Sequence, residues 1–374
     1  MNLIPVFEPY IGDDEINAVV AALERGEISG TFGTAISEFE QAFAEYCGCK
    51  FGVSVTSGTT ALHLAVASIN INPGDEVLLS TSTNIATALA VVHNRGIPVP
   101  IDSEEITWNL DLDMIEQFVT PKTRAIIPVH LFGHPVDMDK LMQIADKYNL
   151  VVIEDCAESH GAECRGRRTG GIGDIGCFSF YANKIITTGE GGMVVTNDQA
   201  IADNLRKLRN MGVTDKRFQH DVLAYNFRMT GYQAAMGLAQ LQKIDSIIRE
   251  KKRVAKTYHK LLGDIPGIQL PQEEPWASSV YWMFAIVVKP EFGISRDKLA
   301  AILLEKGIET REFFYPMDQQ PCLMEITGFH DITCPVAYKL WETGLYLPSS
   351  PTLPDKKIEF ITETIREIQN QAVV

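Results

Sequence analysis

A phosphate-binding turn is the first chemical possibility that the sequence raises. The segment Thr56-Ser57-Gly58-Thr59-Thr60 lies between a predicted strand, Phe51–Val55, and a predicted helix, Ala61–Ser68. Backbone N–H groups at the start of a helix have no intrahelical acceptor, so together with these hydroxyl groups they would bind an anion such as phosphate. The same residue types are ordinary N-caps, and the segment alone leaves both interpretations open.

Two further polar residues follow buried strands. Asp155 follows the predicted strand Val151–Glu154, at the carboxyl end where ligands of open α/β sheets bind. An aspartate there could equally cap the next helix. Lys184 follows a strand predicted over Cys177–Phe180 and precedes a glycine-rich stretch. A lysine amine held near an aldehyde in a partly desolvated pocket has a lowered pKa and forms a Schiff base. Most lysines, in contrast, are solvated surface residues.

A nearby glycine motif matches a dinucleotide-binding fingerprint in its letters only. Gly171, Gly173 and Gly176 have the G-x-G-x-x-G spacing, but Arg165–Thr169 precedes them where a strand is needed, and a strand follows where a helix is needed. The structural context that gives the fingerprint its meaning is therefore absent. We interpret the motif as a glycine-rich turn and exclude an NAD-dependent epimerase or dehydrogenase.

The composition is that of a folded protein with an acidic surface. Of 374 residues, 45% are hydrophobic and 22% are charged, which is typical of globular proteins. The 33 basic and 48 acidic residues give a net charge of −15, which disfavours nucleic acids and anionic membranes as partners. Seven scattered cysteines suggest free thiols and no zinc site, and we find neither a signal peptide nor a membrane span. We expect a cytoplasmic protein that binds no metal.

Short apolar strands alternate with helical patterns from about Phe51 to Asp198, which predicts an α/β layered domain around a largely parallel sheet. Thr230–Leu262 predicts one long helix, and the shorter elements beyond it predict a smaller α+β domain. We place the large domain at residues 1–241 and the small domain at residues 242–374. The other strands predicted in the large domain are Glu76–Leu79, Pro98–Ile101, Ala125–Val129 and Gly192–Thr196.

Taken together and in this order, these segments resemble the DegT/DnrJ/EryC1/StrS family of sugar aminotransferases. The resemblance begins at Gly26-Glu-Ile-Ser-Gly30, includes the segments described above, and continues through Tyr225-Asn-Phe-Arg-Met-Thr230 into the small domain. It implies a fold-type I enzyme that depends on pyridoxal 5′-phosphate (PLP), with a mostly parallel mixed sheet in an α/β/α sandwich. It also implies a homodimer that takes its amino group from L-glutamate.

The resemblance implies roles for individual residues. Lys184 would form the Schiff base with PLP and transfer protons, and Asp155 would pair with the pyridine nitrogen. Some relatives have an aromatic residue near position 84 that stacks on the cofactor ring, whereas this chain has Asn84. The other cofactor contacts that the family implies are Gly58, Thr59, Glu158 and Ser179, with Asn226 reaching the phosphate from the neighbouring subunit.

Two segments of the small domain, Ser279–Phe284 and Thr310–Pro321, resemble one branch of the family most closely. Members of this branch aminate C4 of GDP-4-keto-6-deoxy-D-mannose, which supplies a sugar for the O-antigen of lipopolysaccharide. Asp318 departs from the pattern, because relatives often have histidine there. Arg311 is a candidate for pairing with a diphosphate. The candidates for stacking on a sugar or base are Tyr281, Trp282, Phe313, Phe314 and Tyr315. An aromatic core with one surface arginine is the alternative for this set.

We therefore predict a homodimeric, PLP-dependent 4-aminotransferase of a nucleotide-linked 4-keto-6-deoxyhexose, with the GDP-linked sugar as acceptor. A UDP- or dTDP-linked sugar is the alternative acceptor. Competition binding of GDP, UDP and dTDP would distinguish the two, since specificity is a difference of affinities. A non-catalytic regulator with the same fold is an alternative from another class. The joint presence of Lys184, Asp155, Ser179 and Asn226 argues against it.

Overall fold

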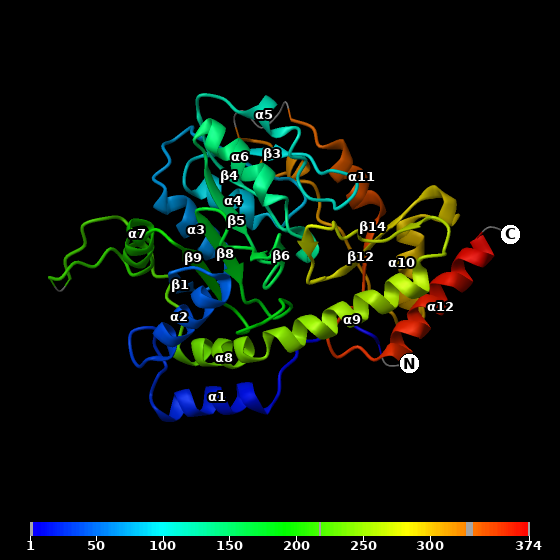
Figure 1. The fold of residues 1–374 in the computed structure, drawn as a ribbon, viewed down its shortest axis with the longest axis horizontal. Helices are drawn as coiled ribbons and strands as arrows, with labels where there is room; N and C mark the ends of the chain where they lie inside the picture. Colours follow the sequence, from blue (N-terminus) through cyan, green and yellow to red (C-terminus); the bar gives the residue numbers. More distant parts are fainter. Residues whose placement is uncertain (1–2, 217, 327–331, 373–374) are drawn as a thin grey trace.

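The computed structural model describes residues 3–216, 218–326 and 332–372. The chain forms two layered parts, and the long helix α9 (Ile244–Leu262) runs from one to the other (Figure 1). The larger part contains a seven-stranded sheet, and the smaller part contains a four-stranded sheet. This architecture confirms the predicted fold class. The division between residues 241 and 242 stays a prediction.

The seven-stranded sheet has the order β1-β9-β8-β5-β4-β2-β3. Only β9 is antiparallel to its neighbours, so the sheet is mostly parallel, as predicted. Several of its strands are largely apolar because helices cover both faces of the sheet; Val77, Leu78 and Leu79 are all fully buried. The strands are β1 (Phe51–Val55), β2 (Glu76–Ser80), β3 (Ile97–Ile101), β4 (Thr123–Ile127), β5 (Val151–Asp155), β8 (Ile175–Ser179) and β9 (Gly192–Thr196).

Helices cover the two faces of this sheet. One face packs against α3 (Gly58–Ser68), α4 (Ala86–His93) and α7 (Gln199–Arg209). The other packs against α2 (Ala35–Cys47), α5 (Ile115–Phe118), α6 (Met138–Tyr148) and α8 (Gly231–Gln242), and α1 (Asp13–Glu24) packs outside α8. Side-chain caps define where several helices begin: Ser57, Asp137 and Asp198 each accept a bond from a backbone N–H in the first turn.

The smaller part is an antiparallel sheet of order β10-β12-β14-β13 that packs its apolar face against α9, α10 and α12. A separate antiparallel sheet, β11-β6-β7, joins residues near 165 to residues near 277. The remaining elements are η1 (Leu131–Gly133), β6 (Glu163–Cys164), β7 (Arg167–Arg168), β10 (Ile268–Gln269), β11 (Ala277–Ser278), β12 (Phe284–Val288), η2 (Pro290–Phe292), α10 (Arg296–Glu305), β13 (Arg311–Glu312), η3 (Met317–Gln319), α11 (Pro335–Thr343), β14 (Gly344–Leu347) and α12 (Asp355–Ala372).

The single helix predicted over Thr230–Leu262 is wrong in one respect, because the structure has two helices that meet at Lys243. The backbone of Lys243 leaves the helical region (φ −112°, ψ 8°). Its ammonium group pairs with the buried carboxylate of Glu15 on α1, and Gln240 donates to the same carboxylate at 2.8 Å. These contacts hold α8 on α1, while α9 turns toward the smaller part. The helical periodicity of the sequence continues through the break, so it gave no sign of it.

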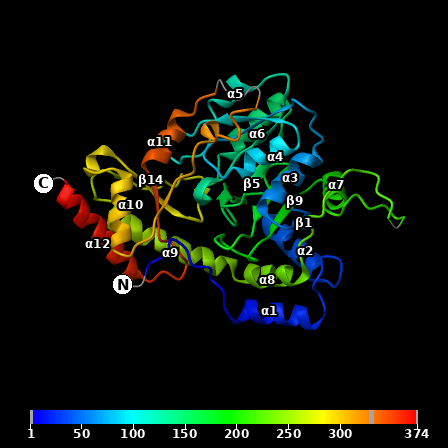
Figure 2. The same cartoon turned by 180° about the vertical axis from the view of Figure 1, so that it is seen from behind.

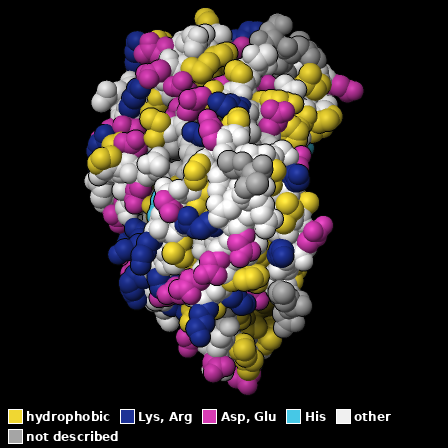
Figure 3. Space-filling view, turned by 90° about the vertical axis from the view of Figure 1, so that its right-hand side faces the viewer, with side chains coloured by type: hydrophobic (Ala, Val, Ile, Leu, Met, Phe, Trp, Pro, Cys, Tyr) yellow, Lys and Arg dark blue, Asp and Glu magenta, His cyan; other side chains and the backbone are white. Residues whose placement is uncertain are grey.

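The described residues of the segment 211–226, which are 211–216 and 218–226, extend from the body of the molecule next to α7 (Figures 1 and 2). They expose large apolar side chains: Leu223 is 98% exposed and Phe218 is 80% exposed. Figure 3 looks onto the end formed by the smaller part, where acidic and basic side chains lie next to one another with hydrophobic side chains scattered between them. No helix among the described residues is long and apolar enough to cross a membrane.

Gly237 on α8 lets this helix approach α2 closely, and it provides a test of the packing. A Cβ atom at position 237 would lie 2.6 Å from the ring of Phe39, which is fully buried. We expect Gly237→Ala to destabilise the protein by about 1 kcal/mol, because overpacking costs about 1–3 kcal/mol and the gain in helix propensity is about 1 kcal/mol. The melting temperature measures this effect. In a Phe39→Leu background the same substitution should become stabilising, and a destabilisation of equal size there would contradict the packing argument.

Candidate active site

A cavity of about 400 Å³ lies at the carboxyl edge of the large sheet, where β5, β8, α3 and α4 face the smaller part. Open α/β sheets bind ligands at this edge. The cavity brings together Lys184 and Asp155, which lie far apart in the sequence. The other residues predicted for the site that line it are Gly58, Thr59, Glu158, Ser179, Trp282 and Arg311.

The start of α3 has the geometry of an anion site. The hydroxyl of Ser57 accepts a bond from the backbone N–H of Thr60 at 3.1 Å, and the hydroxyl of Thr60 accepts one from the backbone N–H of Ser57 at 3.0 Å. This segment therefore caps the helix, which was the alternative to phosphate binding in the sequence analysis. The backbone N–H groups of Gly58 and Thr59 in the first turn have no intrahelical acceptor. The anion site and the cap thus use different groups of the same turn.

Gly58 is required by the close approach of α3 to the end of β8. A Cβ atom at position 58 would lie 2.6 Å from Cβ of Ser179 and 3.0 Å from its Oγ atom. This close approach brings the helix start and the Ser179 hydroxyl together as one continuous polar surface. That surface is suited to a phosphate group.

Asp155 is a buried carboxylate at the end of β5. Its Oδ2 atom accepts a bond from the hydroxyl of Thr87 at 2.8 Å, and Oδ1 accepts one from the backbone N–H of Ala157 at 3.1 Å. Burial raises the pKa of Asp155, and these two bonds compensate only in part. A buried carboxylate with a raised pKa favours a positively charged partner in the cavity.

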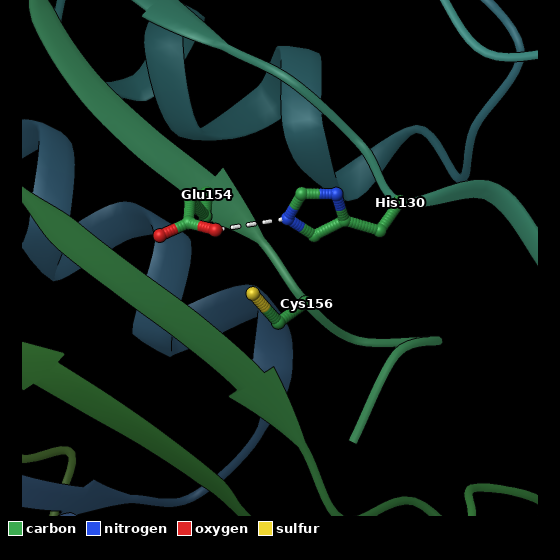
Figure 4. A group of neighbouring side chains, drawn as sticks. All are labelled: His130, Glu154 and Cys156. Carbon is green, nitrogen blue, oxygen red and sulfur yellow. Dashed lines mark hydrogen bonds and ion pairs between the residues drawn. The ribbon is translucent and has the colours of Figure 1, made fainter. Parts of the chain in front are cut away.

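Glu154 lies on the opposite face of β5, and it forms a buried cluster with His130 and Cys156 (Figure 4). The Glu154 carboxylate accepts a bond from Nε2 of His130 at 3.0 Å. It also accepts bonds from the backbone N–H groups of Gly170, Ile172 and Gly173 at 2.7–2.9 Å. The glycine-rich turn that mimics a dinucleotide fingerprint therefore wraps around Glu154, which confirms that it is a turn.

The hydrogen bonds of this cluster leave its ligand atoms occupied. Nδ1 of His130 accepts a bond from the backbone N–H of Val136 at 3.0 Å, so the proton of this ring lies on Nε2 and points to Glu154. Burial raises the pKa of the Cys156 thiol well above its usual value, so the thiol stays protonated. The backbone N–H of His130 also bonds to the carbonyl of Asp155 at 3.3 Å. The cluster therefore supports the strand end that carries Asp155.

Lys184 is the half-buried amine of the cavity. Burial lowers the pKa of Lys184, and the carboxylates of Glu158 and Asp155 oppose this effect. Burial raises the pKa of Glu158 to about 7, while Lys184 and the backbone N–H of Phe132, which bonds to Glu158 at 2.8 Å, lower it. Phe132 holds this N–H in place with a backbone in the left-handed region (φ 53°), an uncommon conformation that is often found at functional sites.

The remaining predicted residues lie outside the lining of the cavity. Asn226 is exposed on the surface of the chain. Phe313 packs in an aromatic core against Trp108 and Phe132, with ring centroids 5.3 and 4.8 Å apart. The hydroxyl of Tyr281 donates to Glu273 at 3.1 Å, and the ring of Tyr315 packs on Trp341.

Phe314 and Asn84, which the sequence analysis also singled out, line the cavity. Phe314, the neighbour of Phe313, faces the cavity, because alternate residues of an extended segment point to opposite sides. Asn84 also lines it, and its Oδ1 atom accepts a bond from the backbone N–H of Ala86 at 3.0 Å. The lining residues that the sequence had not indicated are Leu62, Thr83, Ala86, Val129, Ala157, Tyr181, Asn183, Glu190, Met283, Glu312 and Tyr346.

Comparison with known proteins identifies the family. The model of the DegT/DnrJ/EryC1/StrS aminotransferase family matches residues 9–366. The chain belongs to this family. It is 40% identical over 368 residues to a GDP-perosamine synthase of Escherichia coli O157:H7, which covers 98% of this chain and 99% of that protein.

Solved structures agree with this assignment. The structure of DesV from S. venezuelae, in complex with a ketimine intermediate, matches with a TM-score of 0.91 and 33% identity over 99% of both chains. A putative sugar aminotransferase from Streptococcus pneumoniae in its PLP form matches with a TM-score of 0.91 and 27% identity over 100% of both chains. The protein is thus a PLP-dependent sugar aminotransferase, as predicted.

The residues of the cavity fit PLP. The polar surface at Gly58 and Ser179 suits its phosphate, the undercompensated carboxylate of Asp155 suits a protonated pyridine nitrogen, and Lys184 supplies an amine beside both. When bound, PLP supplies an electron sink that makes a proton of the amino donor removable. The chain itself must hold the cofactor ring and keep the ring nitrogen protonated. It must also move the proton that is removed from the amino donor.

The close approach at Gly58 gives a test of the phosphate site. We expect Gly58→Ala to weaken PLP binding by about tenfold or more, since an overpacking cost of about 1–3 kcal/mol falls on the atoms that hold the phosphate. Titration of the apoprotein with PLP, followed by visible absorbance, measures the Kd. Gly12→Ala is the matched control, because a Cβ atom there meets nothing nearer than 3.9 Å. An unchanged Kd in Gly58→Ala would contradict the assignment.

Proposed function

We propose that the enzyme transfers the amino group of L-glutamate to C4 of GDP-4-keto-6-deoxy-D-mannose and produces GDP-perosamine, a precursor of O-antigen polysaccharide. The observation that carries the proposal is the full-length similarity to GDP-perosamine synthases, at 40% and 38% identity over 98% of the chain. Trp282 and Arg311, from the small-domain segments with the same resemblance, line the cavity. The reaction would take place in the cytoplasm, where all seven cysteines would remain free thiols.

In this proposal each residue of the cavity has a defined task. Asp155 keeps the pyridine nitrogen protonated, and Gly58, Thr59 and Ser179 hold the phosphate. Lys184 anchors the cofactor and then transfers the proton between the donor carbon and the cofactor as base and acid. The lowered pKa of Lys184 supports this task, because a base with a pKa nearer to neutrality accepts and returns a proton readily. Glu158 would lie beside the ring, where a pKa raised to about 7 would allow its carboxyl group to donate or accept a hydrogen bond.

The nucleotide of the acceptor has a competing assignment. The chain is also 38% identical over 311 residues to dTDP-3-amino-3,4,6-trideoxy-alpha-D-glucose transaminase of Streptomyces venezuelae. A UDP-N-acetyl-3-dehydro-alpha-D-glucosamine 3-aminotransferase of Acidithiobacillus ferrooxidans is 38% identical over 341 residues. Both cover less of this chain than the GDP-perosamine synthases do, at 82% and 91%. This difference favours the GDP-linked acceptor.

Acceptor assays separate these assignments. With L-glutamate as donor, we expect kcat/KM for the GDP-linked 4-keto-6-deoxy sugar to exceed that for the dTDP- and UDP-linked sugars by at least about tenfold, which corresponds to about 1.4 kcal/mol of differential binding. Lys184→Ala should reduce turnover by about a thousandfold or more, because it removes both anchor and base. A preference for dTDP or UDP would overturn the acceptor. If L-glutamate does not bleach the yellow absorption band of the bound cofactor, the assignment of glutamate as amino donor would be overturned.

The homodimer belongs to the same proposal. Asn226 does not line the cavity of its own chain, and it lies at the base of the segment 211–226, whose exposed Leu223 and Phe218 would be covered by a second subunit. The family resemblance implies that Asn226 completes the phosphate site of the partner. Two copies of the chain would then share both active sites.

Mixed dimers test the shared site. Lys184→Ala and Asn226→Asp should each be nearly inactive alone, the second because an added carboxylate repels the phosphate. In a shared-site dimer, one of the two sites in each mixed dimer has both native residues. Refolded equimolar mixtures should therefore recover roughly a quarter of wild-type turnover. If Asn226 acts within its own subunit, mixing restores nothing, and this outcome would overturn the shared site.

A further inference from the structure

Lys251 on α9 is a fully buried lysine outside the cavity. Its ammonium group donates to the carbonyl of Trp282 at 2.8 Å, to the carbonyl of Ser349 and to Oγ of Ser349 at 3.4 Å. Three acceptors match the three N–H donors of an ammonium group, and the ring of Phe7 lies 5.6 Å away. Burial alone lowers the pKa of Lys251 to about 7, and no charged group of the described residues opposes it. A buried lysine without a carboxylate partner is costly, so its position calls for a reason.

The residue that Lys251 holds is part of the cavity wall. Trp282 is buried, and hydrogen bonds fix both its backbone carbonyl and its indole ring. Lys251 holds its backbone carbonyl, and its indole N–H donates to the carbonyl of Asn183 at 2.7 Å. Asn183 directly precedes Lys184, and Nζ of Lys184 lies 3.9 Å from the centroid of the Trp282 ring. At this distance a cation is attracted to the face of the ring.

We propose that Lys251 is a positioning residue for Lys184: it fixes the Trp282 backbone and thereby the indole face on which the Lys184 ammonium group rests. In the enzyme cycle this face gives the Lys184 amine a defined place whenever it is not attached to the cofactor. That consequence rests on the proposed role of Lys184. The contact itself does not, because it joins two side chains of this chain.

Three titratable groups influence Lys184 in addition to Trp282. The carboxylates of Glu158 and Asp155 favour its charged form. The pKa of His160 is lowered to about 3 by burial and by Lys184, so this ring is neutral near pH 7. The indole face acts in the same direction as the carboxylates, since it also favours the ammonium form. Loss of that face should therefore lower the pKa of Lys184.

Competitive acetylation of the full-length apoprotein measures this directly. Acetic anhydride reacts only with the free amine, so the rate at Lys184, followed by mass spectrometry over a range of pH, gives the midpoint of its titration. The plateau at high pH reports accessibility separately. Below the midpoint, Trp282→Leu should raise the rate about two- to fivefold, as expected for loss of a cation–π contact. Glu158→Gln calibrates the assay, because it must shift the midpoint in the same direction.

The Lys251 variants distinguish positioning from direct charge. Lys251→Met should lower the Lys184 midpoint, whereas loss of a repelling charge acting directly would raise it. Lys251→Gln keeps a donor for the Trp282 carbonyl without the charge, so it should restore the midpoint toward that of the wild type. The double variant Lys251→Met/Trp282→Leu should behave like Trp282→Leu alone.

Several outcomes would overturn the proposal. A raised midpoint in Lys251→Met, additive shifts in the double variant, or an unchanged midpoint in Trp282→Leu would each do so. If Lys251→Met does not fold by circular dichroism, Lys251→Gln and Trp282→Leu carry the test, and a raised midpoint in Lys251→Gln would contradict it. Because no step requires turnover, failure here is separate from failure of the proposed reaction.

Discussion

The two adjacent carboxylates at the end of β5 impose the constraint on which the site depends. Successive residues of a strand point to opposite faces, so Glu154 and Asp155 are buried in different surroundings. Each buried carboxylate needs donors or a cation. Although burial acts in the opposite direction, the bonds from His130 and from backbone amides lower the pKa of Glu154, while the pKa of Asp155 stays raised. One strand end thus carries one satisfied carboxylate and one that a cationic ligand would complete.

The donors of Glu154 also explain the shape of the surrounding chain. The turn through Gly170 and Gly173 closes around its carboxylate, and β8 begins directly after this turn. That arrangement sets where β8 ends, at Ser179, against the start of α3. The phosphate surface at Gly58 and the carboxylate of Asp155 are therefore placed relative to each other by bonds on the far face of the sheet. A side chain that never meets the ligand shapes the site through the backbone.

The sequence predicted the strands and the chemistry of the large part because both depend on local patterns. Apolar runs located β1 to β5 within two residues, and the family pattern located Asp155 and Lys184. The break at Lys243 was not predictable, since it results from a tertiary contact with Glu15. Nor was the choice of Phe314 over Phe313 as a lining residue, because both are aromatic and only the register of an extended segment decides which one faces the cavity. Lys251 has no local signature at all: it lies in a charged helix, and only the fold buries it.

The charges of the cavity place a limit on what one chain can bind. Four carboxylates (Asp155, Glu158, Glu190 and Glu312) and two cations (Lys184 and Arg311) line it. A cofactor phosphate and the diphosphate of a nucleotide-linked sugar both bring further negative charge. Lys184 is already balanced by Glu158 and Asp155, and Arg311 is within ion-pair distance of Glu309 at 3.6 Å. A single chain therefore offers too little positive charge for the acceptor. We expect groups outside this lining to neutralise the diphosphate, and the second subunit of the proposed dimer would be their most direct source.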